Sequence, residues 1–292
     1  MRTILVMLAI PVLVAACSSG ARPAGSALPV VASTNVYGDI AAQIGGAHVD
    51  VTSILTDPNA DPHLFEPGTR NGLAVSEARL LIENGVGYDG FMGRLANAAP
   101  SSNRIVVSIG AALSVHGRDA NPHLWYDVSR LPQIAAAIAD GLRRADPPHA
   151  NAYRTGLRRF TNSLRPLDRE VQTIRERFAG RAVAYTEPVP GYLLDAAGLR
   201  NLAPTAFTRA IENGTEPSPQ AVAAMDDLVR KHRIAGLLYN SQAVSPITAR
   251  IRAEATAAGI PVVGVTETLP SGLHFQKWQL RQGRALEGAL SK

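Results

Sequence analysis

The stretch from Asp146 to Gly180, DPPHANAYRTGLRRFTNSLRPLDREVQTIRERFAG, decides the fold. Its apolar residues recur at alternating intervals of four and three, which is the period of one face of an α-helix. This stripe consists of Tyr153, Leu157, Phe160, Leu164, Leu167, Val171, Ile174 and Phe178. Asp146 stands where an N-cap is expected, with proline in the first turn. At 1.5 Å per residue, a helix of about 32 residues is about 48 Å long and crosses a whole small protein.

Pro166 lies inside this helix and cannot donate a backbone hydrogen bond. The sequence therefore predicts a helix from Pro147 to Phe178, ending at Ala179-Gly180, with a bend near Asn162–Pro166. The alternative is two helices broken at that point. The unbroken apolar stripe favours one bent helix.

Strand and helix signals alternate on both sides of this helix. Strands are expected at 29–33, 49–55, 79–83, 104–109, 181–186, 234–239 and 260–266, and helices at 36–44, 218–232, 246–258 and 275–290. Strands separated by helices indicate parallel βαβ units. The fold class is therefore α/β: two Rossmann-like lobes (29–146 and 181–292), joined by a connecting helix (147–180) and otherwise touching only around a cleft.

The composition fits an exported domain that is stabilised by its core. Hydrophobic residues make up 46% of the chain, and Cys17 is the only cysteine, so no disulfide holds the fold. The net charge is +5, almost all basic residues are arginine, and they are scattered along the chain. This pattern indicates a solvated surface and not a nucleic-acid site.

Two short motifs echo each other in the first lobe. They are Asp61-Pro62-His63-Leu64 and Asn121-Pro122-His123-Leu124, and each places a histidine behind a proline in a loop. Proline restricts its own backbone and that of the preceding residue, so such a loop holds a side chain in one direction. Imidazole is a good ligand for divalent transition metals. The repeat therefore predicts two metal ligands, His63 and His123.

Two carboxylates occupy matching places in the second lobe. Glu187 and Glu267 each follow a threonine at the end of an expected strand. Ligands of open α/β sheets bind beyond the carboxyl ends of the strands, so these carboxylates and the two histidines are expected to meet in the cleft. A single glutamate at such a place is more often a charge partner for a helix N-terminus. Two glutamates at matching places favour a binding site.

These motifs resemble those of the zinc- and manganese-binding solute-binding proteins of ABC transporters. Pro62-His63-Leu64-Phe65-Glu66-Pro67 and Asn121-Pro122-His123-Leu124-Trp125-Tyr126-Asp127 resemble the two histidine motifs of that family. Residues 82–89, Glu216-Pro217-Ser218-Pro219 and Asn240-Ser241-Gln242 are similar too. The similarity covers nearly all of residues 29–292. The family has two lobes and a rigid connecting helix.

The resemblance implies that His63, His123, Glu187 and Glu267 bind one zinc or manganese ion. Glu187 matches the family's third ligand, and Glu267 stands where the family usually has aspartate. Glu66 and Asp127 are expected to orient the imidazoles from behind. The long histidine-rich loop of many zinc members is missing here, and His116 is interpreted as a solvated loop residue. Two nitrogens and two carboxylates suit zinc and manganese alike.

The implied function is capture of a divalent metal outside the cytoplasm and its delivery to a membrane permease driven by an ATPase. The protein is expected to act as a monomer and not as an enzyme. One alternative is a metal-dependent hydrolase, but catalytic zinc sites usually keep three protein ligands and an open water position. The other is a surface adhesin, an activity ascribed to some relatives.

The N-terminus predicts export and a lipid tether. Arg2 precedes an apolar run, Ile4 to Ala16, which at about 13 residues is too short to span a bilayer. Val14-Ala15-Ala16-Cys17 resembles a bacterial lipobox, in which the chain is cleaved before the cysteine and its thiol is acylated. Residues 1–17 are thus interpreted as a lipoprotein signal ending in an acylated Cys17, and 18–28 as a flexible linker. An ordinary secretory signal with an incidental cysteine is the alternative. The expected location is the outer side of a bacterial cell membrane.

Replacing Cys17 with serine tests the tether. Because the variant lacks the thiol that would carry the acyl chain, Cys17→Ser should release the protein into the soluble extracytoplasmic fraction or block its processing. Fractionation of cells followed by immunoblotting measures this. Normal processing with unchanged membrane association would contradict the lipoprotein interpretation.

Overall fold

The computed structural model describes residues 27–58, 62–117 and 119–292. The signal segment, Cys17 and most of the linker lie outside these residues. Within them, no helix is long and apolar enough to cross a membrane.

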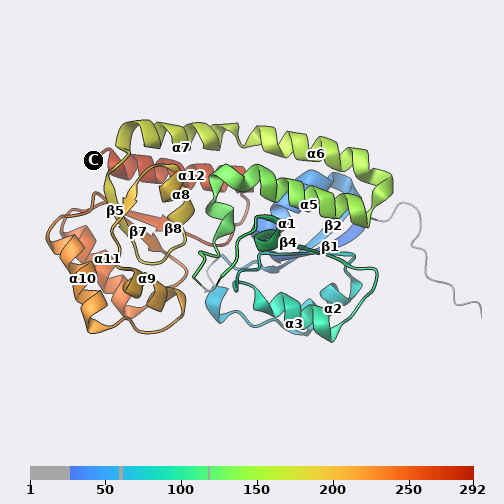
Figure 1. Ribbon diagram of the computed structural model, residues 1–292, viewed down its shortest axis with the longest axis horizontal. Coiled ribbons are helices and arrows are strands. Elements are labelled where there is room, and N and C mark those ends of the chain that lie inside the picture. Colours follow the sequence, from blue (N-terminus) through green and yellow to red (C-terminus); the bar gives the residue numbers. More distant parts are fainter. Residues whose placement is uncertain (1–26, 59–61, 118) are drawn as a thin grey trace, which may run out of the picture.

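The first lobe is a parallel four-stranded sheet with helices on both faces (Figure 1). Its strand order is β2-β1-β3-β4, with β1 at Leu28–Thr34, β2 at Val49–Leu55, β3 at Leu80–Glu83 and β4 at Ile105–Ser108. Helices α1 (Asn35–Gly45), α5 (Leu131–Ala145) and α6 (Ala150–Ser163) pack together on one face, and α2 (Thr69–Glu77) and α3 (Gly90–Ala98) lie on the other. The short α4 (Ile109–Ala112) follows β4. All four strands match the sequence prediction to within two residues at either end.

The second lobe repeats this arrangement. Its parallel sheet has the order β6-β5-β7-β8, with β5 at Ala182–Tyr185, β6 at Arg200–Asn201, β7 at Leu237–Asn240 and β8 at Val262–Val265. Helices α7 (Arg165–Phe178), α8 (Gly191–Ala196) and α12 (Phe275–Leu290) lie toward one face, and α9 (Thr205–Glu212), α10 (Pro219–Arg230) and α11 (Pro246–Ala257) lie toward the other (Figure 1). In each lobe the chain continues from one central strand to one edge of the sheet and from the other central strand to the opposite edge. Open α/β sheets bind ligands at the carboxyl ends of the strands where the connections diverge in this way.

The connection between the lobes differs from the single bent helix that the apolar stripe predicted. It is two helices, α6 and α7, placed end to end across both lobes and interrupted at Leu164 (Figure 1). The interruption falls within the predicted region, Asn162–Pro166. Pro166 lies in the first turn of α7 and has no backbone N–H, so it cannot continue the backbone hydrogen bonds of α6. The side chain of Asp146 does not form the predicted N-cap hydrogen bond with the backbone. Its carboxylate accepts hydrogen bonds from His149 Nδ1 at 2.7 Å and from the Tyr153 hydroxyl.

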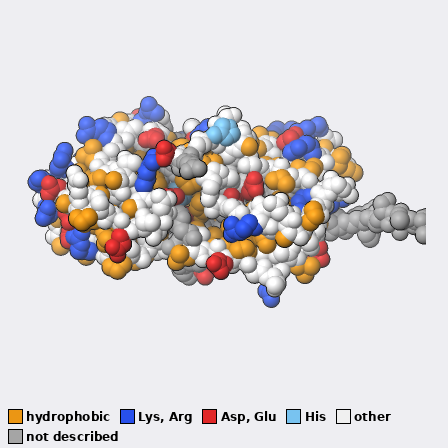
Figure 2. All heavy atoms as spheres, turned by 60° about the horizontal axis from the view of Figure 1, so that its bottom comes forward, with side chains coloured by type: hydrophobic (Ala, Val, Ile, Leu, Met, Phe, Trp, Pro, Cys, Tyr) orange, Lys and Arg blue, Asp and Glu red, His pale blue; other side chains and the backbone are white. Residues whose placement is uncertain are grey.

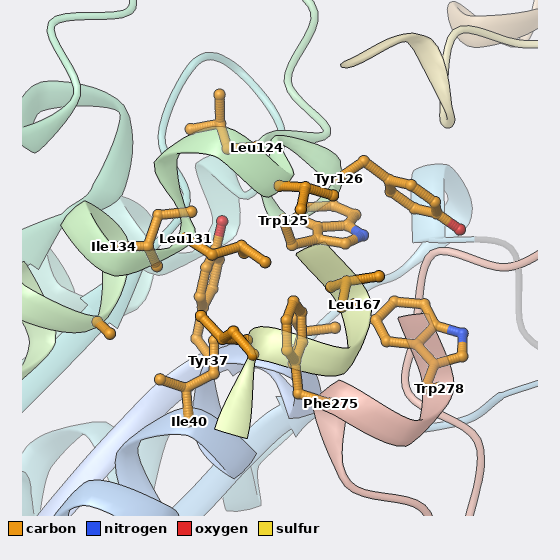
Figure 3. Packing of buried hydrophobic residues seen from close by; sticks show 14 of the residues in the cluster. Tyr37, Ile40, Leu124, Trp125, Tyr126, Leu131, Ile134, Leu167, Phe275 and Trp278 are labelled. Carbon is orange, nitrogen blue, oxygen red and sulfur yellow. The ribbon is translucent and has the colours of Figure 1, made fainter. Parts of the chain in front are cut away.

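The lobes are not separate bodies that touch only around a cleft, as the sequence suggested. One cluster of buried apolar residues includes side chains of both sheets. Figure 3 shows part of this cluster. At its centre Tyr37 of α1 and Trp125 pack edge to face, and Phe275 and Trp278 of α12 do the same. Leu167 at the start of α7 belongs to this cluster as well. The two sheets are therefore held by a shared core.

The contact between α1 and α6 is close enough to test. A Cβ atom added to Gly156 in α6 would lie 2.0 Å from the carbonyl oxygen of Ile44 in α1. Because this neighbour is backbone and cannot turn aside, Gly156→Ala should lower the free energy of unfolding by about 1–3 kcal/mol. Chemical denaturation measures the change.

Gly288→Ala is the matched control for that substitution. Gly288 is an exposed glycine in α12, with nothing within 4 Å of an added Cβ. Its replacement should leave stability unchanged or raise it by up to about 1 kcal/mol, since glycine is unfavourable inside a helix. Equal effects at both positions would contradict the close approach of α1 and α6.

Candidate metal site

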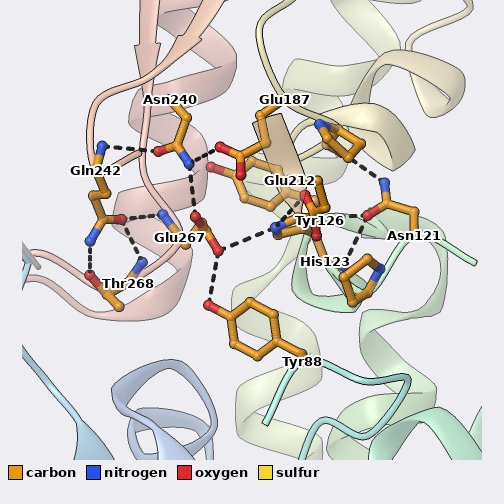
Figure 4. Close-up of polar contacts among 12 residues, drawn as sticks. Tyr88, Asn121, His123, Tyr126, Glu187, Glu212, Asn240, Gln242, Glu267 and Thr268 are labelled. Carbon is orange, nitrogen blue, oxygen red and sulfur yellow. Dashed lines mark hydrogen bonds and ion pairs between the residues drawn. The ribbon is translucent and has the colours of Figure 1, made fainter. Parts of the chain in front are cut away.

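His123 lies fully buried between the lobes, in the loop that leads into the short 3₁₀ helix Leu124–Tyr126. Asn121 holds it from behind: Asn121 Oδ1 accepts the backbone N–H of His123 at 3.0 Å and lies 2.8 Å from its Nδ1 (Figure 4). The other end of the Asn121 amide donates to the carbonyl of Pro188 at 2.7 Å, which sets its orientation. Because an amide oxygen only accepts, Nδ1 carries a proton and Nε2 is the nitrogen that faces the site.

Glu267 faces that nitrogen from the second lobe. Its Oε2 lies 3.2 Å from His123 Nε2 and accepts the Tyr88 hydroxyl at 2.9 Å. Glu187 lies nearby, because Asn240 Nδ2 donates both to Glu187 Oε2 and to Glu267 Oε1, the latter at 2.8 Å (Figure 4). Both carboxylates are at most 1% exposed. A buried histidine and two buried carboxylates thus converge from the two lobes.

The strand ends of the second lobe explain how these side chains meet. Glu187 follows β5, Asn240 ends β7 and Glu267 follows β8, and these three strands are neighbours in one parallel sheet. Their carboxyl ends therefore share an edge. Gln242 braces that edge by accepting the backbone N–H groups of Glu267 at 2.5 Å and Thr268 at 3.1 Å. Hydrogen bonds from within the second lobe therefore hold the carboxylates in place.

A third carboxylate lies close to the same imidazole. Glu212 Oε2 is 4.0 Å from His123 Nε2. Burial lowers the pKa of His123, but the negative charges of Glu212, Glu267 and Glu187 more than offset this, so its pKa is raised above the usual value. So much negative charge held away from water favours a cation at this place.

The structure brings together three of the four residues predicted as ligands. His123, Glu187 and Glu267 form one connected cluster, as described above. The backbone of His63 lies in the short 3₁₀ helix Pro62–Leu64, and its side chain is outside the described part of the structure. Among the described side chains, no group of three or more His, Cys, Asp or Glu residues forms a metal site by itself. The ligand set therefore stays a prediction.

The two residues expected to orient the imidazoles are placed differently. Asp127 accepts hydrogen bonds from Ser129 Oγ at 2.6 Å and Arg130 Nε at 2.5 Å, and its predicted role of orienting an imidazole stays a prediction. Asn121 supports His123. Glu66 is exposed on the loop after Pro62–Leu64, and its predicted role is untested by the described contacts.

Sequence reasoning singled out no individual role for four residues of the site. These are Tyr88, Asn121, Glu212 and Asn240. Tyr88, Asn121 and Asn240 lie in segments that resemble the metal-binding family, so the motifs contained a signal for them. Glu212 ends a helix that the strand and helix signals did not predict, and nothing in its local sequence marks it.

Comparison with known proteins places these observations in a family. A family model described as "Zinc-uptake complex component A periplasmic" matches residues 30–289. Among curated proteins, the manganese ABC transporter substrate-binding lipoprotein PsaA of Streptococcus mitis is 26% identical over 255 residues, which covers 82% of this chain and 81% of PsaA.

Solved structures show the same fold. The laminin-binding adhesin Lmb of Streptococcus agalactiae, in a mutant form, superimposes with a TM-score of 0.76 at 22% identity, covering 90% of this chain and 99% of Lmb. FpvC of Pseudomonas aeruginosa in complex with Mn²⁺ gives a TM-score of 0.75 at 20% identity, covering 91% and 99% of the two chains.

The raised pKa of His123 makes stability depend on pH in a defined direction. A group whose folded-state pKa exceeds its unfolded value of about 6.5 stabilises the protein fully below that value and loses this contribution as pH rises. Without metal, the parent protein should therefore have a higher free energy of unfolding than His123→Gln. This difference should be largest at acid pH and should shrink as the pH rises. Urea denaturation in the presence of a chelator measures both. A stability difference that grows with pH would refute the assigned environment of His123.

Proposed function

Because the chain belongs to the family of the periplasmic zinc-uptake component A, we propose that it captures a divalent transition metal, zinc or manganese, outside the cytoplasm and delivers it to the permease of an ABC transporter. The observation that carries the proposal is the fully buried His123 imidazole, with Glu267 3.2 Å and Glu212 4.0 Å from its Nε2. Imidazole with carboxylates is a donor set that suits both metals.

Each contact in the site has a role in capture. We assign His63, His123, Glu187 and Glu267 as the ligands of the transported ion. Asn121 keeps Nδ1 protonated, so Nε2 is the atom that exchanges a proton for the metal. A proton and the metal ion therefore compete for the same nitrogen, Nε2 of His123. Asn240 holds two carboxylates close together by donating to both.

The shared core supports local rearrangement over a swing of whole lobes. Hydrogen bonds tie the lobes together beside the site: Leu269 N donates to Asn35 Oδ1 at 2.9 Å, and Asn35 Nδ2 donates back to Leu269 O at 2.8 Å. Phe275 N donates to Asp39 Oδ2 at 2.9 Å in the same region. Opening the lobes widely would break these bonds and expose the apolar cluster. We therefore place metal exchange in the loops and side chains that line the site.

Delivery to a permease fits a protein that is tethered outside the membrane. The acylated Cys17 and the linker 18–28 would keep the binding domain close to its transporter. We assign the chain no catalytic role, and we propose that it acts as a monomer without nucleic-acid partners.

Substitution of the histidines tests the proposal. His63→Ala and His123→Ala should each weaken zinc and manganese binding by about 100-fold or more, since loss of a direct ligand should cost at least as much as loss of an outer partner. Titration against a competing chelator, followed by calorimetry, gives the dissociation constants.

His116→Ala is the matched control, because His116 is exposed in a loop. Its binding constants should equal those of the parent protein. If the His63 and His123 variants bind both metals as tightly as the parent, metal capture at this site is wrong.

A further inference from the structure

Glu212 stands apart from the other carboxylates of the site by its position. It is the last residue of α9, and its side chain is 15% exposed, whereas those of His123 and Glu267 are 0% exposed. Its Oε2 nevertheless reaches to 4.0 Å from His123 Nε2. Figure 4 shows Glu212 and Glu267 approaching the same imidazole. Glu212 therefore lies at the outer side of the buried cluster.

A cavity of about 550 Å³ adjoins this outer side. Residues from both lobes line it, among them Tyr88, Asn121, Tyr192, Asp195 and Glu212. His123, Glu187 and Glu267 do not line it. Glu212 is thus the carboxylate that faces both the cavity and the imidazole.

The distances of Glu267 and Glu212 from His123 Nε2 are each compatible with two donors of one ion. Two donors that each lie about 2.1–2.2 Å from the same ion are about 3.0–4.3 Å apart, as the angle between them opens from 90° to 180°. The separation of His123 Nε2 from Glu267 Oε2 is 3.2 Å, and its separation from Glu212 Oε2 is 4.0 Å. Both values fall within this range.

Building on the proposed function, we propose that Glu212 is an additional ligand of the transported ion and that it makes the site favour manganese over zinc. With Glu212, the described side chains His123, Glu187, Glu267 and Glu212 already supply the four donors of the tetrahedral arrangement that zinc prefers, before the predicted ligand His63 is counted. Manganese accepts six donors and is suited by carboxylate, carbonyl and water oxygens. The neighbouring cavity has room for a water molecule to complete such a shell.

Selectivity of this kind has to come from the number and type of donors. At a site of equal geometry, zinc binds more tightly than manganese. A third carboxylate adds negative charge and an oxygen donor, and both help the harder ion more. Glu212 would then change the ratio of the manganese and zinc affinities, and not only raise both of them.

The experiment compares Glu212→Gln with the parent protein for both metals. Removing the charge while keeping the shape should weaken Mn²⁺ binding by about 10-fold or more and Zn²⁺ binding by less than about 3-fold. Competition titrations with Mn²⁺ alone and Zn²⁺ alone give the ratio of the two dissociation constants. The thermal midpoint of the metal-free variant shows that it is folded.

Asp195→Asn is the matched control. Asp195 lines the same cavity, and the structure shows no contact between it and His123 in the described part of the chain. Its variant should keep the metal preference of the parent. If Asp195→Asn shifts the preference as much as Glu212→Gln does, the cavity acts through its overall charge and the ligand assignment is wrong.

A second measurement decides the assignment without any variant. In a crystal structure of the parent protein loaded with Mn²⁺, an oxygen of Glu212 should lie at ligand distance from the ion. A Glu212 carboxylate turned away from the ion, or an equal loss of affinity for both metals in Glu212→Gln, overturns the inference while leaving metal capture intact. A parent protein that binds neither metal would instead refute the proposed function itself.

Discussion

The contact between His123 Nε2 and Glu267 Oε2 is the interaction around which the site between the lobes is organised. Both side chains are fully buried, and they come from different lobes. Removing an imidazole and a carboxylate from water is costly unless each is paired and hydrogen-bonded. Asn121 and Asn240 supply those bonds, and Tyr88 adds another. The molecule holds charged groups in an arrangement whose excess negative charge a divalent cation would neutralise.

The shared apolar core is what allows this arrangement to persist. Aromatic side chains from α1, α12 and the 3₁₀ helix Leu124–Tyr126 pack into one cluster beside the site. Trp125 touches the site directly, with its ring centroid 5.4 Å from that of His123 and 4.9 Å from that of Tyr88. A close-packed interior does not deform continuously, so it fixes the separation of the two lobes. The carboxylates of the second lobe are thereby kept at a fixed separation from the imidazole of the first lobe.

The connecting segment shows what the period of apolar residues can predict about a helix and what it cannot. The apolar stripe from Tyr153 to Phe178 continues through the interruption at Leu164 without a change of phase. Leu164 keeps helical backbone angles, φ −77° and ψ −18°, so the side chains on either side still face the same core. The apolar stripe indicates which face of the helices is buried, but it does not indicate whether every backbone hydrogen bond is formed. A helix cap, by contrast, is a local feature: Ser218 caps α10 by accepting the N–H of Ala221, three positions on, at 3.3 Å.

The sequence by itself determined the α/β class, the helical connection between the lobes and the presence of His123, Glu187 and Glu267 at loops and strand ends. These features depend on period, on turn residues and on the chemistry of single side chains, all of which can be read locally. Only the tertiary structure decided that Asn121 supports the imidazole, that Glu212 lies beside it, and that one core spans both lobes. His123 and Glu267 are 144 positions apart. Contacts over such separations follow from how whole elements pack, and no local pattern records that packing.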